Sequence, residues 1–251
     1  MGELGFFSQL WYLVFTLVVF GVIIKWWGVT FQNPASRRSQ RLDWFHDYIC
    51  LFLIWIVIRV GFFLFFLRKT KWLFKGSSEH SWLEFFWTIT PAFVLIFIGV
   101  PSMHILYRQR VDRESDITLK VTGNQWFWSY NYLDFNNISF DSFIIPVQNL
   151  SGGGFRLLDT DNRIILPVQS NIRLGVCASD VLHAWAMPSL GLKVDAVPGR
   201  INFLNIYGGQ VGLFFGQCRE ICGSNHRFIP IVLEITRFSL FKSWIQIFSL
   251  R

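Results

Sequence analysis

Two long apolar runs near the start of the chain constrain its fold more than any other feature. Residues 48–67 and 85–106 each supply the about 20 apolar residues that an α-helix needs to cross a bilayer. Arg59 interrupts the first run, and Pro91 and Pro101 lie inside the second, but membrane helices tolerate both when neighbouring groups compensate. The sequence therefore predicts a two-helix transmembrane hairpin over residues 45–110.

A third apolar stretch, residues 10–24, follows a short start that carries Glu3 and no basic residue. Because it is shorter than a full span, it fits a cleaved leader, an interfacial helix or a short extra span. We interpret residues 1–44 as a leader or accessory segment followed by a polar linker. Between the two longer runs lie Arg68, Lys69, Lys71 and Lys75, which favour the inner side of the membrane for that loop.

The charge of the chain is unevenly distributed. The net charge is +7, yet residues 112–236 carry 9 basic and 11 acidic residues. The basic excess therefore belongs to the membrane-flanking segments and the tail, as is usual for membrane proteins. This distribution removes the main argument for nucleic-acid binding.

From Ile117 onward the pattern changes to short runs of strand-forming residues separated by Gly, Asn, Asp and Pro. About seven such runs indicate an all-β domain over residues 111–236, built as an antiparallel sandwich or barrel. The tail, residues 237–251, spaces its large apolar residues on one face of a helix, namely Phe238, Phe241, Trp244, Ile245 and Phe248. We expect this amphipathic tail to lie against the domain or the membrane surface.

Four residues form the strongest chemical signal. Cys218, Cys222 and His226 share the segment GQCREICGSNH, and His183 lies in SDVLHAW. Two thiolates and two imidazoles suit zinc or copper. Structural zinc sites usually contain a Cys-x-x-Cys pair, whereas three residues separate these cysteines, so copper is favoured while zinc remains an alternative. The other cysteines and histidines fit packing or interfacial roles: Cys50, Cys177, His46, His80 and His104.

Three long segments carry a family resemblance. CREICGSNHRFIP, DVLHAWAMPSLGLKVDAVPGRIN and GNQWFWSYNYLDF resemble the copper loop, the first-histidine segment and the aromatic segment of the cytochrome c oxidase subunit II family. The similarity runs from about Phe45 to the tail. It implies a membrane hairpin followed by a cupredoxin-like Greek-key sandwich or barrel.

The resemblance also implies a ligand set. In this family two copper ions share two cysteine sulfurs, which assigns Cys218 and Cys222 as bridging ligands and His183 and His226 as terminal ligands. Glu220 would give its backbone carbonyl to copper and its carboxylate to a magnesium or manganese ion shared with subunit I. Ile229 stands where the family has a methionine that acts as a weak axial ligand, so we expect a raised copper potential.

Further functional residues follow from the same resemblance. Trp126 corresponds to the tryptophan that receives electrons from cytochrome c, and Glu84 to a glutamate at the mouth of a proton channel. Cytochrome c is basic, so acidic docking residues are expected; the candidates are Asp134, Asp141, Asp159 and Asp161. Asparagine occupies three positions where the family often has acids, which weakens the expected docking: Asn131, Asn136 and Asn137.

The implied function is electron transfer from cytochrome c through the copper pair to haem in subunit I, where oxygen is reduced and protons are pumped. The implied partners are cytochrome c, oxidase subunits I and III and the lipid bilayer, with no nucleic acid. The implied location is the mitochondrial inner membrane with the copper domain in the intermembrane space, or else a bacterial plasma membrane. Three alternatives are a quinol-oxidase subunit, a membrane-anchored copper chaperone or sensor, and a structural zinc module.

Overall fold

The computed structural model describes residues 31–71, 79–109, 114–135, 138–150 and 154–249. The described residues divide into two compact units: residues 41–109 form one, and residues 31–40 together with those from 114 onward form the other. The apolar stretch 10–24, which we interpret as a leader or accessory segment, lies outside the described residues.

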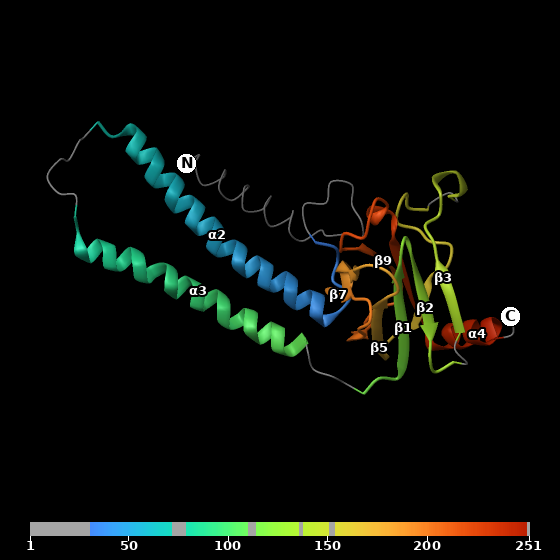
Figure 1. Ribbon diagram of the computed structural model, residues 1–251. Coiled ribbons are helices and arrows are strands. Elements are labelled where there is room, and N and C mark those ends of the chain that lie inside the picture. The colour runs from blue at the N-terminus through green and yellow to red at the C-terminus, as the bar shows by residue number, and fades with distance from the viewer. Residues whose placement is uncertain (1–30, 72–78, 110–113, 136–137, 151–153, 250–251) are drawn as a thin grey trace, which may run out of the picture. The chain divides into compact units, whose positions relative to one another are not determined.

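The membrane unit is a pair of long helices, α2 (Arg37–Lys69) and α3 (Ser81–Gln109) (Figure 1). Both are long and apolar enough to cross a membrane, and α3 contains Pro91 and Pro101 as expected. The Tyr48 hydroxyl of α2 donates a hydrogen bond to the Phe97 carbonyl of α3, at 3.1 Å. The Arg59 guanidinium lies 4.8 Å from the Trp55 ring centroid one turn earlier, which gives this charge within the apolar run a cation–π partner.

The segment that precedes α2 belongs to the second unit. Ser36 caps α2, because its hydroxyl accepts a hydrogen bond from the Ser39 backbone N–H at 3.1 Å. The Ser36 hydroxyl also donates to the Leu190 carbonyl at 2.7 Å, and the Ala35 N–H donates to the Ser189 carbonyl at 2.8 Å. Ala35 and Ser36, which belong to the same unit as the β domain, are therefore hydrogen-bonded to the segment that follows β6 (His183–Met187).

The β domain contains two five-stranded sheets. The first has the order β3-β2-β1-β5-β8 and the second β4-β10-β9-β6-β7. The strands of the first sheet are β1 (Ile117–Asn124), β2 (Phe127–Tyr132), β3 (Ile138–Ser142), β5 (Asn171–Ala178) and β8 (Asn202–Tyr207). Those of the second are β4 (Ile164–Pro167), β6 (His183–Met187), β7 (Leu192–Ala196), β9 (Gly212–Cys218) and β10 (Pro230–Thr236).

The expected sandwich is confirmed, but its strands are not all antiparallel. β1 pairs with β5, and β4 with β10, in parallel. Strands of a Greek-key arrangement return by long connections, so non-consecutive strands can meet in either direction. Sequence periodicity predicts which residues form strands but not the direction of strands that are far apart in the chain.

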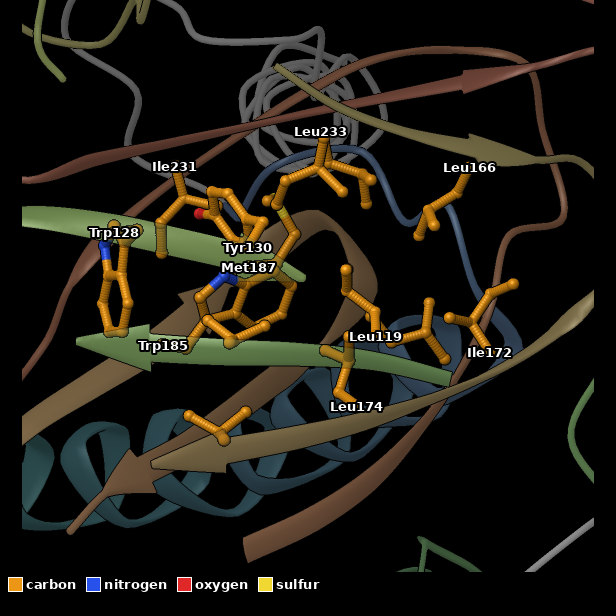
Figure 2. Close-up of a cluster of buried hydrophobic side chains, with 14 of the residues drawn as sticks. Leu119, Trp128, Tyr130, Leu166, Ile172, Leu174, Trp185, Met187, Ile231 and Leu233 are labelled. Carbon is orange, nitrogen blue, oxygen red and sulfur yellow. The ribbon is translucent and has the colours of Figure 1, made fainter. Parts of the chain in front are cut away.

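The two sheets enclose one apolar core. Figure 2 shows Trp185, Tyr130 and Met187 gathered at its centre, with Trp128 toward one end. All four are at most 1% exposed. Trp128 and Tyr130 alternate along β2 with outward-facing residues, which is the period expected of a half-buried strand. Both aromatic side chains therefore belong to the core of the domain.

The C-terminal helix α4 (Phe238–Ser249) covers part of this core. Phe241 is 2% exposed, and the Trp244 ring lies 5.3 Å from the Tyr132 ring, centroid to centroid. The amphipathic tail therefore packs on the domain. Tyr132 itself joins the two sheets, because its hydroxyl donates to the Ile165 carbonyl at 2.8 Å and accepts from the Ile165 N–H at 3.0 Å.

We predict that Tyr132→Phe destabilises the domain by roughly 1–3 kcal/mol, because both backbone groups of Ile165 lose their partner in a buried site. The measurement is thermal unfolding followed by near-ultraviolet circular dichroism. Tyr207→Phe is the matched control, since Tyr207 lies at the surface with 41% exposure and the same atom is removed. Equal unfolding temperatures for the two variants would contradict the prediction.

Candidate metal centre

Two adjacent strands of the second sheet bring the predicted metal ligands together. His183 is the first residue of β6 and Cys218 the last residue of β9. The strands pair antiparallel, with Trp185 opposite Cys218, so His183 lies diagonally across from Cys218 on the same side of the sheet. The loop that follows β9 then carries Cys222 and His226 back toward the strand end.

The side-chain donors converge. The ligand atoms of His183, Cys218 and Cys222 all lie within 4.8 Å of one another, and all three residues are buried. The Cys218 Sγ is 3.9 Å from the His183 Nδ1 and 4.0 Å from the Cys222 Sγ. The His226 Nδ1 lies 3.5 Å from the Cys222 Sγ. All four predicted ligands therefore meet in one place, with two sulfurs between two imidazoles.

Asp180 fixes the orientation of the His183 ring. The His183 Nε2 lies 2.8 Å from the Asp180 Oδ1, and a carboxylate is only an acceptor, so Nε2 carries the hydrogen. This leaves Nδ1, the nitrogen nearest to Cys218, as the donor for a metal. A carboxylate that holds a ligating histidine in this way is common around metal sites. Burial would raise the pKa of Asp180, but hydrogen bonds from His183 and from the backbone of Val181 and Gln125 bring it below its usual value.

The two thiols differ in acidity. Burial raises the pKa of the Cys222 thiol, and the charge of the neighbouring Cys218 raises it further. Burial is also the largest influence on the Cys218 thiol and acts against its ionisation, but hydrogen bonds with His183, with the backbone of Ala184 and Glu220 and with His226 together outweigh burial and lower the pKa of that thiol. Two thiolates this close repel each other, so a cation bound between them is needed before both ionise at neutral pH. The donor set fits a soft metal cation.

Gly123 of β1 provides the space for the His183 ring. A Cβ atom at Gly123 would lie 2.9 Å from the His183 Cγ and 3.0 Å from its Cβ, closer than ordinary packing allows. The ring also contacts Trp128, whose ring centroid is 5.9 Å away and which is the cross-strand partner of Gly123. The imidazole therefore packs over the backbone of β1 and against a buried indole of β2.

Trp126 lies against the loop that carries the cysteines. It is half-buried in the turn directly before β2, and a Cβ at Gly223 would be 3.3 Å from its Nε1 and Cζ2 atoms. Gly223 directly follows Cys222 and has a φ of +122°, a conformation that favours glycine. The indole thus contacts the residue adjoining one candidate ligand.

Comparison with known proteins identifies the family. Residues 117–236 match the family described as cytochrome C oxidase subunit II, periplasmic domain, and residues 24–105 match its transmembrane domain. Cytochrome c oxidase subunit 2 of Drosophila ambigua is 47% identical over 221 residues, which cover 88% of this chain and 96% of the relative. The chain belongs to the cytochrome c oxidase subunit II family.

Other relatives agree with this assignment. The subunit 2 of Drosophila lowei is also 47% identical over 221 residues, covering 88% of this chain and 96% of that protein. The crystal structure of the periplasmic domain of subunit II of cytochrome oxidase (CoxB) of Bradyrhizobium japonicum is 40% identical. It matches with a TM-score of 0.52 over 55% of this chain and 97% of that chain, which confirms the cupredoxin-like fold.

Membership in the subunit II family settles the broad class. The chain is a membrane-anchored subunit of an oxidoreductase, cytochrome c oxidase, and its His-Cys-Cys cluster is compatible with copper. The chaperone and zinc-module alternatives are therefore set aside.

The remaining predicted residues of the copper loop have defined places. The Glu220 carbonyl lies 3.4 Å from the Cys218 Sγ, at the edge of the candidate centre, and its side chain is only partly buried. Ile229 is 1% exposed, and its carbonyl accepts a hydrogen bond from the Cys218 N–H at 3.1 Å. A hydrocarbon side chain is therefore buried at residue 229, beside the last residue of β9.

The four candidate docking acids differ in their surroundings. Asp141 accepts a hydrogen bond from the Ser129 hydroxyl at 2.7 Å, and Asp161 accepts from the Phe143 N–H at 2.7 Å. Asp134 binds the Thr118 N–H at the far end of β2 from Trp126. Asp159 is 6% exposed and pairs with Arg163 at 3.2 Å. Asn136 and Asn137 lie outside the described residues.

Several predicted residues lie away from the metal ligands in the chain. Glu84 is in the first turn of α3, in the membrane unit. His80 caps that helix, because its Nδ1 accepts from the Leu83 N–H at 3.2 Å. His46 lies near Cys50 on α2, with its Nε2 3.6 Å from the Sγ atom. The Cys177 Sγ lies 3.5 Å from the Thr122 hydroxyl.

Sequence reasoning missed two residues that shape the centre, Asp180 and Gly123. Asp180 lies three residues before His183, and an acid at that spacing from a candidate ligand is a signal that could have been used. Gly123 looks like a strand residue in the sequence. Its role depends on contact with a strand 60 residues later, which only the fold reveals.

We predict that Gly123→Ala weakens copper binding by roughly tenfold to a hundredfold, the range found when groups that orient a ligand are disturbed, because the new methyl group displaces the His183 ring. The measurement is competition for copper against a chelator of known affinity. Gly175→Ala is the control, since a Cβ there meets the side chains of Phe203 and Ile201 instead. Equal affinities in the two variants would refute the role of Gly123.

Proposed function

We propose that this chain receives electrons from cytochrome c at Trp126, holds a binuclear copper centre, and passes the electrons to haem in subunit I for oxygen reduction coupled to proton pumping. One observation carries the proposal: His183, Cys218, Cys222 and His226 converge around two sulfurs 4.0 Å apart. Family membership supplies the context of an oxidase complex.

His183, Cys218, Cys222 and His226 would hold the copper ions, with the Glu220 carbonyl as a further donor. When bound, the copper pair would supply reversible one-electron chemistry. The protein keeps the ligand atoms in place before and after each transfer: the strand pair β6–β9 fixes His183 and Cys218, and Asp180 prevents rotation of the His183 ring. A rigid, largely buried set of ligands limits the rearrangement that accompanies electron transfer.

Trp126 is proposed as the first acceptor, because its indole lies against Gly223 beside Cys222. Asp141 and Asp161 lie toward the same end of the first sheet, since β3 ends opposite the start of β2. We propose that these two carboxylates attract the basic donor. Asp134 lies just beyond the far end of β2, so the six residues of that strand separate it from Trp126 by about 20 Å, and it would act at the edge of that surface. Asp159 is buried and paired with Arg163, so we leave it out of the docking surface.

Two further residues are assigned by the same family argument. The Glu220 carboxylate, which is partly exposed beside the ligand loop, would bind magnesium or manganese together with subunit I, since hard ions prefer carboxylate oxygen. Glu84, in the first turn of α3, would lie at the mouth of a proton channel. Subunits I and III and lipid would surround the hairpin. The Drosophila relatives support the mitochondrial inner membrane, with the copper domain in the intermembrane space.

The test is metal analysis with electron paramagnetic resonance on the full chain, purified in detergent and supplied with copper. We predict two coppers per chain and the multi-line spectrum of one electron shared between them. Cys218→Ser and Cys222→Ser should each abolish that spectrum, whereas Cys177→Ser, which changes a cysteine of β5 outside the centre, should preserve it. A four-line spectrum of a single copper, or zinc alone, would exclude the binuclear centre.

Ile229 provides a test of how the protein sets the reduction potential of the copper centre. We predict that Ile229→Met lowers the reduction potential of the copper centre, because an added thioether donor stabilises the oxidised form. The measurement is a potentiometric titration followed optically. Ile231→Met, at an equally buried position of β10, controls for the change in packing alone. A potential that moves equally in both variants would show that residue 229 has no axial influence.

A further inference from the structure

Gln125 contacts both halves of the candidate metal centre. It lies at the turn between β1 and β2, directly before Trp126. Its backbone N–H donates to the Asp180 Oδ2 at 2.6 Å, and the other oxygen of Asp180 binds His183. Its side-chain Nε2 donates to the Cys222 carbonyl at 2.8 Å. One residue is therefore hydrogen-bonded to the segment of the first histidine and to the cysteine loop.

The Gln125 side chain and the Trp126 indole cover the same glycine. A Cβ at Gly223 would lie 3.1 Å from the Gln125 Nε2 and 3.3 Å from the Trp126 Nε1 and Cζ2. The indole nitrogen of Trp126 is buried and has no hydrogen-bond partner within the described part of the chain. The indole is thus held against the loop by packing, whereas the neighbouring amide is held by a directed bond.

We propose that Gln125 is a positioning residue for electron transfer: its amide clamps the Cys222–Gly223 peptide against the Trp126 indole. The inference rests on the proposed role of Trp126 as the acceptor. Its physical basis is that the rate of electron transfer depends steeply on the contact between the indole and the cysteine loop. Packing alone would hold the indole too loosely, because a functional group must stay within roughly 0.5 Å of its productive position. A glutamine is suited to the task because it combines an amide donor with sufficient reach.

Other residue types would not make this clamp. A glutamate at this position has the same length but only acceptor oxygens at neutral pH, so it would repel the Cys222 carbonyl. Asparagine keeps the amide but is one methylene shorter. Methionine has nearly the same length and no donor. These three substitutions separate the hydrogen bond from the space that the side chain fills.

The experiment uses the assembled oxidase and measures the rate of electron transfer within its complex with a photoactivatable, ruthenium-labelled cytochrome c. Gln125→Met should slow this step roughly tenfold, since a displacement of about 1 Å in a positioned group can cost up to about a hundredfold. Gln125→Glu should slow it at least as much. Copper content, the paramagnetic resonance spectrum and the affinity for cytochrome c should be unchanged. Gln210→Met, at the exposed turn before β9, is the matched control.

Each other result is decisive. An unchanged rate in Gln125→Met, or an altered affinity for cytochrome c with an unchanged rate within the complex, overturns the clamp. Loss of copper or a changed spectrum in both Gln125→Met and the milder Gln125→Asn would assign Gln125 to the metal centre itself and also overturn it. Trp126→Phe tests the underlying function separately: if that variant transfers electrons at the normal rate, Trp126 is not the acceptor, whatever Gln125 does.

Discussion

The pairing of β6 with β9 is the interaction on which the candidate centre depends. It places the first residue of β6 beside the last residue of β9. His183 and Cys218 are 35 residues apart in the chain, yet the His183 Nδ1 lies 3.9 Å from the Cys218 Sγ. The backbone bonds continue past the strand end, where the Arg219 N–H donates to the Ala184 carbonyl at 3.1 Å. Both side chains are thereby directed by regular sheet geometry, and only the second cysteine and second histidine rely on a loop.

Much of the architecture could be predicted from the sequence, because its signals are local. The hairpin follows from two apolar runs, and the ligands Cys218, Cys222 and His226 lie within nine residues. The parallel pairs β1–β5 and β4–β10 could not be predicted, because strand direction depends on connections rather than on periodicity. The roles of Gly123 and Gln125 were hidden for a similar reason: each depends on a contact with a distant segment, and neither residue type is unusual in a turn or strand.

The positions of acidic residues in the sequence predicted function less well than the Cys-His ligand motif did. Four aspartates looked equivalent as docking residues, yet Asp159 is buried beside Arg163 while Asp141 and Asp161 accept hydrogen bonds near the surface. Asp180, by contrast, binds the ring of His183. The function of a carboxylate here is decided by its neighbours, and hydrophobic patterning does not reveal those neighbours.

The hydrogen bonds that join Ala35 and Ser36 to the segment Pro188–Leu190 have a consequence for how the domain is completed. The globular unit is discontinuous: part of it precedes the membrane hairpin and the rest follows it. Both parts must therefore reach the same side of the bilayer before the domain is whole, which requires an even number of crossings between them. A fragment that begins after the hairpin would lack Ala35 and Ser36, so the carbonyls of Ser189 and Leu190 would bind water instead. Those carbonyls directly follow β6, the strand that begins with His183.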